Sequence, residues 1–112
     1  MFKKENRLVP GIRFNDSRFI ASPQFTLKEK KNGLNVNRFG IVVSKKIDKR
    51  AVGRNEIKRF IRTAIMNLDR KMNTGHDILI IVRKEILGKT KEENLLTIES
   101  SLEKAGAIRI KD

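Results

Sequence analysis

The 112-residue sequence contains no cysteine, no tryptophan and no tyrosine, and only one histidine and two prolines. Without cysteine it can form neither disulfides nor thiolate metal sites, which fits a reducing compartment. Its longest apolar run, residues 78–82, is far too short to cross a bilayer. The N-terminal segment lacks the apolar stretch of a secretion signal. We therefore expect a cytoplasmic protein.

Acidic residues are scarce beside basic ones. The chain has 26 lysine and arginine residues against 13 aspartate and glutamate residues, so its net charge is +13. Holding this charge in one small domain costs repulsion energy unless a partner supplies the opposite sign. Nucleic acid is the partner that we expect, and an anionic membrane surface is the second candidate. Stacking on bases would fall to arginine or to the six phenylalanines.

The length fits one compact domain. We expect residues 1–112 to form a single RNA-binding domain, with about 1–13 as a flexible basic arm. This arm contains Pro10-Gly11, a pair that is typical of turns. Residues 14–22 are ambiguous, and Asp16-Ser17 would cap one short helical turn there.

Apolar patterns predict three strands. Residues 24–30 alternate between apolar and polar side chains, as a half-buried strand does. Residues 38–44 predict a second strand, and the Gly- and Asn-containing loop between the two predicts an antiparallel hairpin. The continuous apolar run within residues 77–83 predicts a central strand that is buried on both faces.

Two amphipathic helices are also predicted. Residues 54–72 have apolar side chains at steps of three and four, and Asn73-Thr74-Gly75 would end this helix. The second helix would begin near Thr90, in a capping box with Glu93, and stop at Gly106. Its apolar stripe would be Leu95, Ile98 and Leu102. Residues 107–111 would add a short edge strand, and the whole reads as helices packed on a sheet.

The first predicted helix separates its apolar side from its basic side. At 100° per residue, with Ile57 at zero, the cations fall between about 60° and 200°, and Glu56 lies off this face at about 260°. Charge runs are often merely solvated, but Arg54, Lys58 and Arg62 repel one another at four-residue spacing. We therefore interpret the face as phosphate-binding.

Neighbouring residues extend this basic face. Lys45 and Lys46 leave the preceding strand just before the helix. Asn55 would donate to phosphate or sugar oxygens, or else cap the helix. The N-terminal amides of the helix, near Gly53 and Arg54, would add a second phosphate-binding element.

Other candidate sites are weak. His76 could pair with Asp77 as a base, but a lone surface histidine is the favoured interpretation. The acids are dispersed, so we expect no metal site and no catalytic residue in the protein itself. Phe25 and Phe39 share strand faces with apolar neighbours and are expected in the core. Phe14 and Phe19 are therefore the better stacking candidates.

These residues together resemble the bacterial ribonuclease P protein component. Its signature stands here as Val43-Ser44-Lys45-Lys46, Ala51-Val52 and Arg54-Asn55-Glu56-Ile57-Lys58-Arg59 with Arg62. The opening of the chain at residues 4–8 and the strand at 77–84 are also similar. The match covers most of the chain from about residue 22 onward. The loop 47–53 is one residue longer than is usual in the family, and Glu56 replaces an arginine of the motif.

The resemblance implies an α+β fold, a two-layer α/β sandwich in which helices pack on a small mixed sheet. It further implies a left-handed β-α-β crossover (ribosomal protein S5 domain 2-like), with the family's first helix shortened or absent here. The implied function is that of an accessory subunit of an endoribonuclease. Its partners would be the ribonuclease P catalytic RNA, which performs the chemistry, and precursor tRNA, whose 5′ leader is removed. Mg²⁺ would be held mainly by the RNA, and neither a membrane nor a small-molecule substrate is implied.

The resemblance also assigns roles to residues. The expected contacts to the catalytic RNA, with Arg50 included for its charge, are Lys45, Lys46, Arg50, Arg54, Asn55, Lys58, Arg59 and Arg62. The expected contacts to the leader are Phe14, Phe19 and Lys28. A basic ribosomal protein or a general RNA chaperone is the alternative, because charge and size suit it equally well. The ordered motif favours the ribonuclease P subunit.

Overall fold

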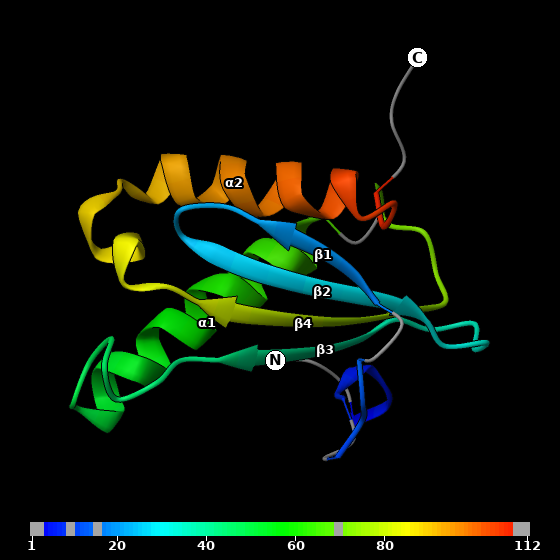
Figure 1. Ribbon diagram of the computed structural model, residues 1–112, viewed down its shortest axis with the longest axis horizontal. Coiled ribbons are helices and arrows are strands. Elements are labelled where there is room, and N and C mark those ends of the chain that lie inside the picture. Colours follow the sequence, from blue (N-terminus) through cyan, green and yellow to red (C-terminus); the bar gives the residue numbers. More distant parts are fainter. Residues whose placement is uncertain (1–3, 9–10, 15–16, 69–70, 109–112) are drawn as a thin grey trace.

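A mixed four-stranded sheet with two α-helices on one of its faces forms the protein (Figure 1). This computed structural model describes residues 4–8, 11–14, 17–68 and 71–108. The elements are η1 (Lys4–Asn6), β1 (Arg18–Ala21), β2 (Phe25–Lys31), β3 (Arg38–Val42), α1 (Ala51–Asn67), β4 (His76–Val82), η3 (Lys84–Gly88) and α2 (Lys91–Lys104). The α+β two-layer prediction is confirmed. No helix among these residues is long and apolar enough to cross a membrane.

The strands lie in the order β1-β2-β4-β3. β2 pairs antiparallel with β1 and β4, whereas β3 pairs parallel with β4 and is joined to it through α1. The predicted hairpin between β2 and β3 is therefore wrong, because β4 lies between them. The predicted β-α-β unit is present, and its left-handedness stays a prediction.

The length of the loop between β2 and β3 explains why the hairpin prediction was wrong. Residues 32–37 have to cross two inter-strand spacings, about 10 Å, which six residues span with ease. β4 is the most apolar strand of the chain and is central, as predicted. Placing it between two partners satisfies its backbone on both edges and buries its helix-facing side chains, which outweighs the local pairing. Leu79 and Ile81 on its other face are only half-buried, so the predicted burial on both faces is correct only in part.

The pleat of the sheet sorts its side chains onto two faces. Phe25 and Leu27 of β2, with Phe39 of β3, point toward the helices and are buried in the core. Both phenylalanines are therefore core residues, as predicted. The opposite face carries Lys28, and neither α-helix covers it (Figure 1). β1 was not predicted, and its start replaces the expected helical turn, of which Asp16 lies outside the described residues.

The bounds of α1 differ from the predicted 54–72. It starts three residues earlier, at Ala51, because Gly53 is accommodated inside the first turn. It ends at Asn67, so the predicted stop at Gly75 is wrong. Gly75 instead has φ of 91° in the turn before β4, where its carbonyl accepts from the Asn32 N–H at 2.9 Å.

The second helix agrees closely with its prediction. Thr90 and Glu93 form both hydrogen bonds of the capping box, and α2 ends just before Gly106, which has φ of 77°. Leu95 is a correction, since it is 41% exposed while Asn94 and Ser101 are buried beside Ile98 and Leu102. Of the predicted strand at 107–111, Ile108 forms an isolated bridge with Met72, and residues 109–111 lie outside the described range.

A buried aspartate at the start of β4 fixes the β2–β3 loop. Asp77 is 0% exposed and accepts hydrogen bonds from Arg38 Nε at 2.8 Å and Nη2 at 2.7 Å. Asn32 Nδ2 donates to the same carboxylate at 3.0 Å and to the carbonyl of Val36 at 3.0 Å. Asp77 thus ties β3 and the loop to the central strand.

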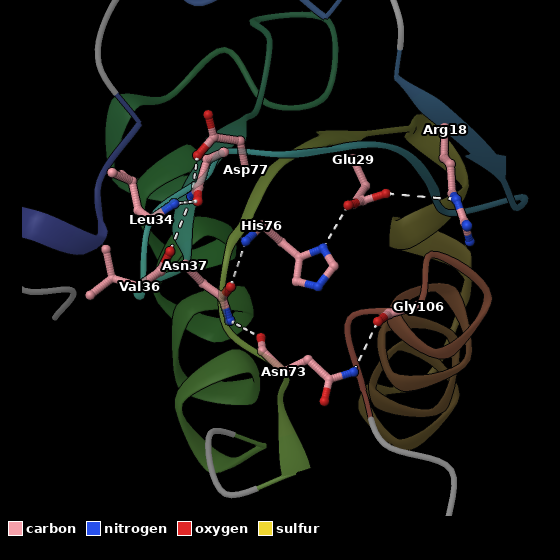
Figure 2. A network of polar contacts seen from close by, with 10 residues as sticks. Arg18, Glu29, Leu34, Val36, Asn37, Asn73, His76, Asp77 and Gly106 are labelled. Carbon is pink, nitrogen blue, oxygen red and sulfur yellow. Dashed lines mark hydrogen bonds and ion pairs between the residues drawn. The ribbon is translucent and has the colours of Figure 1, made fainter.

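The same end of the sheet corrects the interpretation of His76. It is 7% exposed and therefore not a surface residue. Its imidazole pairs with Glu29 and not with the Asp77 carboxylate: Nδ1 lies 2.6 Å from Glu29 Oε2 (Figure 2). Its backbone N–H donates to Asn37 Oδ1 at 2.9 Å, while Asn37 Nδ2 donates to the Asn73 carbonyl at 2.6 Å. His76 is therefore part of a structural network that joins β2, β4 and the loops.

Candidate nucleic-acid interface

The burial of α1 agrees with the predicted separation of its two sides. The apolar stripe lies in or against the core. Arg54, Lys58 and Arg62 are half-buried along its border, and Asn55 and Arg59 are exposed on the far side. One helix therefore packs through one side and presents cations on the other. Their contact with RNA stays a prediction.

The loop before α1 engages two of the predicted RNA-binding arginines. Arg50 forms an ion pair with Asp48, with Nη2 and Oδ2 3.1 Å apart. Arg54 Nη1 donates to the backbone carbonyls of Asp48 at 3.0 Å and Lys49 at 2.9 Å. Gly53 is buried against the Asp48 carboxylate. An acid of the protein thus lies beside the helix end at Gly53, and the Arg54 N–H donates to the Arg50 carbonyl at 3.1 Å. Phosphate binding by this helix end stays a prediction.

The other predicted RNA-binding residues have free polar groups. Within the described parts of the chain they make no ion pair and no side-chain hydrogen bond. They are Lys45, Lys46, Asn55, Lys58, Arg59 and Arg62. Such cations keep their full capacity to bind phosphate oxygens.

The helix-free face of the sheet brings the predicted leader-binding residues together. Phe19 of β1 pairs directly with Lys28 of β2, and Lys28 pairs with Leu79 of β4. Directly opposed side chains have Cβ atoms about 5 Å apart. Phe19 is 61% exposed, so its ring is available for stacking. The row reaches Gly40 on β3.

A second row on this face was missed from the sequence. It crosses the four strands as Ala21–Thr26–Ile81–Val42. Val42 is 44% exposed. The alternation of side chains in β3 already predicts that Val42 points to the face away from Phe39. The row itself could not be predicted, because β1 and the strand order were not known from the sequence. The two rows form a largely apolar surface with one central lysine.

Phe14 is arranged differently from Phe19. The Nζ of Lys30 lies 5.4 Å from the centre of the Phe14 ring and also donates to the Arg13 carbonyl at 2.8 Å. This cation–π contact occupies one side of the ring. Phe19 is therefore the better placed of the two aromatic candidates.

The start of the chain covers the β3 end of this face. Asn6 Nδ2 donates to the Asn37 carbonyl at 2.8 Å, and the Leu8 N–H donates to the Phe39 carbonyl at 3.1 Å. A Cβ at Gly40 would lie 2.9 Å from Leu8 Cδ1, so the glycine lets Leu8 pack onto β3. Residues 4–8 thus border this apolar surface and leave its Phe19 end accessible.

No three His, Cys, Asp or Glu side chains of the described segments gather in a group that could hold a metal ion. The interface consists of cations, amides and apolar surface.

Known proteins resemble the chain over nearly its whole length. The family model for Ribonuclease P matches residues 2–106. The ribonuclease P protein component of Clostridium botulinum is 39% identical over 108 residues, which cover 92% of this chain and 96% of that protein. The component from Bacillus mycoides is 36% identical over 117 residues, covering 97% and 98%.

Solved structures agree with the sequence relatives. The RNase P protein of Staphylococcus aureus superposes with a TM-score of 0.76 at 29% identity, covering 86% of this chain and 87% of that one. The RNase P protein from Thermotoga maritima gives a TM-score of 0.65 at 28% identity, covering 88% of each. On sequence and fold together, this chain belongs to the Ribonuclease P protein family.

Proposed function

We propose that this chain is the protein subunit of a ribonuclease P ribonucleoprotein, in which it binds the catalytic RNA and the 5′ leader of precursor tRNA. The observation that carries the proposal is a set of cations along α1 and the preceding loop that have no ion-pair partner among the described residues, within a member of this family. The chain would act in the cytoplasm as the accessory part of an endoribonuclease that matures tRNA 5′ ends.

The basic face of α1 would dock on the catalytic RNA. Arg59, Lys58 and Arg62 extend from a helix whose other side is fixed in the core, so they are held in place before RNA arrives. A rigid scaffold lowers the entropy lost on binding. Phosphate contacts of this kind position a protein on RNA without reading its sequence.

The helix-free face of the sheet would hold the leader. Phe19 offers a ring for base stacking, and Lys28 beside it offers a charge for the phosphate backbone. This combination of an aromatic platform and a cation is typical of surfaces that bind single strands with little sequence preference. Cleavage itself would be performed by the RNA with Mg²⁺ that RNA groups mainly hold.

Reconstitution tests the proposal. Protein added to ribonuclease P RNA, at a magnesium level just below that which the RNA alone requires, should raise the rate of precursor tRNA cleavage. We expect at least about a tenfold increase, equal to about 1.4 kcal/mol of transition-state stabilisation. Protein alone, freed of contaminating nuclease, should not cleave.

Two outcomes would contradict this role. Cleavage by the RNA-free protein would place the chemistry in the protein. Equal stimulation of unrelated ribozymes would favour the general RNA chaperone instead. The cleavage site should be mapped in each case, since only cutting at the mature 5′ end supports the proposal.

Leader binding depends on Phe19 in this proposal. Replacing Phe19 with alanine should weaken binding of precursor tRNA to the holoenzyme by about tenfold, within the roughly 1–3 kcal/mol of one base–aromatic stack. Binding of mature tRNA, which has no leader, should not change. Leu96→Ala is the matched control, because Leu96 is 70% exposed on α2 and distant from this face. Equal losses for both tRNAs would rule out a leader contact at Phe19.

A further inference from the structure

An acid lies at the centre of the basic loop, packed against the first turn of α1. Asp48 Oδ1 accepts from the Arg50 backbone N–H at 2.9 Å, and the Arg50 guanidinium reaches both carboxylate oxygens. Its side chain is 20% exposed although the loop projects into solvent. The hydrogen bonds from the Arg50 side chain and backbone hold the pKa of Asp48 below its ordinary value.

Gly53 is what lets the carboxylate approach the helix. A Cβ at this position would overlap the Asp48 carboxylate, at a separation that real side chains do not reach. Gly53 has no positive φ, so its backbone would accept any residue. The glycine is therefore explained by space for Asp48 and not by helix geometry, where glycine is unfavourable.

Arg54 holds the same loop from the helix. Its Nη1 donates to the carbonyls of Asp48 and Lys49, which lie six and five residues before it in the loop. Ile47, 9% exposed, anchors the loop in the core. Backbone carbonyls, a carboxylate and an apolar side chain thus fix this loop against α1.

We infer that Asp48, seated on Gly53, is a positioning residue that fixes the basic loop, residues 45–50, against α1 in the geometry that binds RNA. The inference rests on the proposed function. The expected effect on affinity is the reverse of what charge alone predicts, because a negative charge in the middle of an RNA-binding face is expected to strengthen RNA binding. The reason is that an ordered loop loses less conformational entropy when its cations engage phosphates.

The direction in which RNA affinity changes on replacing Asp48 distinguishes this positioning role from a purely electrostatic effect. Asp48→Ala removes one negative charge, which by charge alone should tighten binding to ribonuclease P RNA. We expect about fivefold weaker binding instead, on the scale of ordering one flexible side chain. Glu56→Ala is the matched control, since Glu56 is an exposed acid of α1 and its removal changes net charge equally. It should leave affinity unchanged or raise it.

A double-mutant cycle tests the contact between the Asp48 carboxylate and Gly53. Gly53→Ala changes no charge and favours the helix, but it displaces the Asp48 carboxylate. It should weaken RNA binding by about fivefold in the wild-type background and have little effect in the Asp48→Ala background, as expected for residues in direct contact. Circular dichroism of each variant should show that α1 is retained.

The outcomes separate this inference from the proposed function. If the wild type binds ribonuclease P RNA and the Asp48→Ala variant binds it equally well or more tightly, the positioning role alone is overturned. Equal effects of Gly53→Ala in both backgrounds overturn it as well. Absence of wild-type binding to ribonuclease P RNA, across the salt range tested, overturns the proposed function and with it this role.

Discussion

Replacing Asp77 with alanine is expected to lower the free energy of unfolding by about 3 kcal/mol, the low end of the range for breaking a buried ion pair. The carboxylate is buried and accepts three hydrogen bonds, two from Arg38 and one from Asn32. Without it the Arg38 guanidinium, whose side chain is only 21% exposed, keeps its charge and loses its partner. Urea unfolding near neutral pH measures the change, with Glu103→Ala as an exposed control.

The same residue predicts how stability depends on pH. Burial alone would raise the pKa of Asp77, but the hydrogen bonds from Arg38 and Asn32 outweigh it and leave the pKa below its ordinary value. The charged form therefore stabilises the fold above the unfolded-state pKa of about 3.9, and this contribution is lost as pH falls through the lower native pKa. The stability gap between wild type and Asp77→Asn should narrow across that acidic window. A gap that stays constant to the lowest pH at which both variants fold would contradict the assignment.

Reversing two charges on α1 should have the largest effect on RNA binding. The double variant Arg59→Glu, Arg62→Glu is expected to bind ribonuclease P RNA about 100-fold less tightly, because two phosphate contacts become repulsive. The slope of log affinity against log salt should fall by about 0.7 for each phosphate of single-stranded RNA that the variant no longer neutralises. Filter binding over a range of salt concentrations measures both quantities.

A control with the same charge change separates local contacts from net charge. Lys91→Glu, Lys104→Glu alters the total charge equally, and both lysines are exposed at the ends of α2. It should weaken binding far less than the α1 variant does. If the two double variants lose affinity equally, the positive field of the whole protein governs binding and the α1 face has no special role.

Local signals predicted those elements that local interactions determine. The Thr90–Glu93 capping box marks the start of α2 without reference to any other part of the chain, and Gly106 marks its end. The angular separation on α1 likewise follows from helix geometry alone. The order of these elements also predicted helices packed on a sheet. The left-handedness of the crossover, in contrast, was inferred from the family resemblance alone.

Features that depend on residues far away in the chain could not be predicted from the sequence. The hairpin was predicted from loop composition, but strand order depends on β4, which follows in the chain. His76 looked like a surface residue because nothing near it in the sequence identifies Glu29 as its partner. Gly53 suggested a loop, and only the neighbouring Asp48 carboxylate explains its place inside a helix. Phe19 and Lys28 were chosen separately, and β1 makes them neighbours.

The position of β4 between β2 and β3 governs the order in which the sheet can assemble during synthesis. Chains emerge from their N-terminus, so β2 and β3 are made before the strand that separates them. Until His76–Val82 arrives, both strands present an unpaired edge, which is a template for mispairing. They are also free to form the direct hairpin that the native sheet excludes. Native pairing of Phe25 with Val82 joins residues that are far apart in the sequence, and long-range contacts of this kind form slowly. Nascent chains that end before β4 would therefore be the aggregation-prone species, and the central strand would close the sheet in one late, cooperative step.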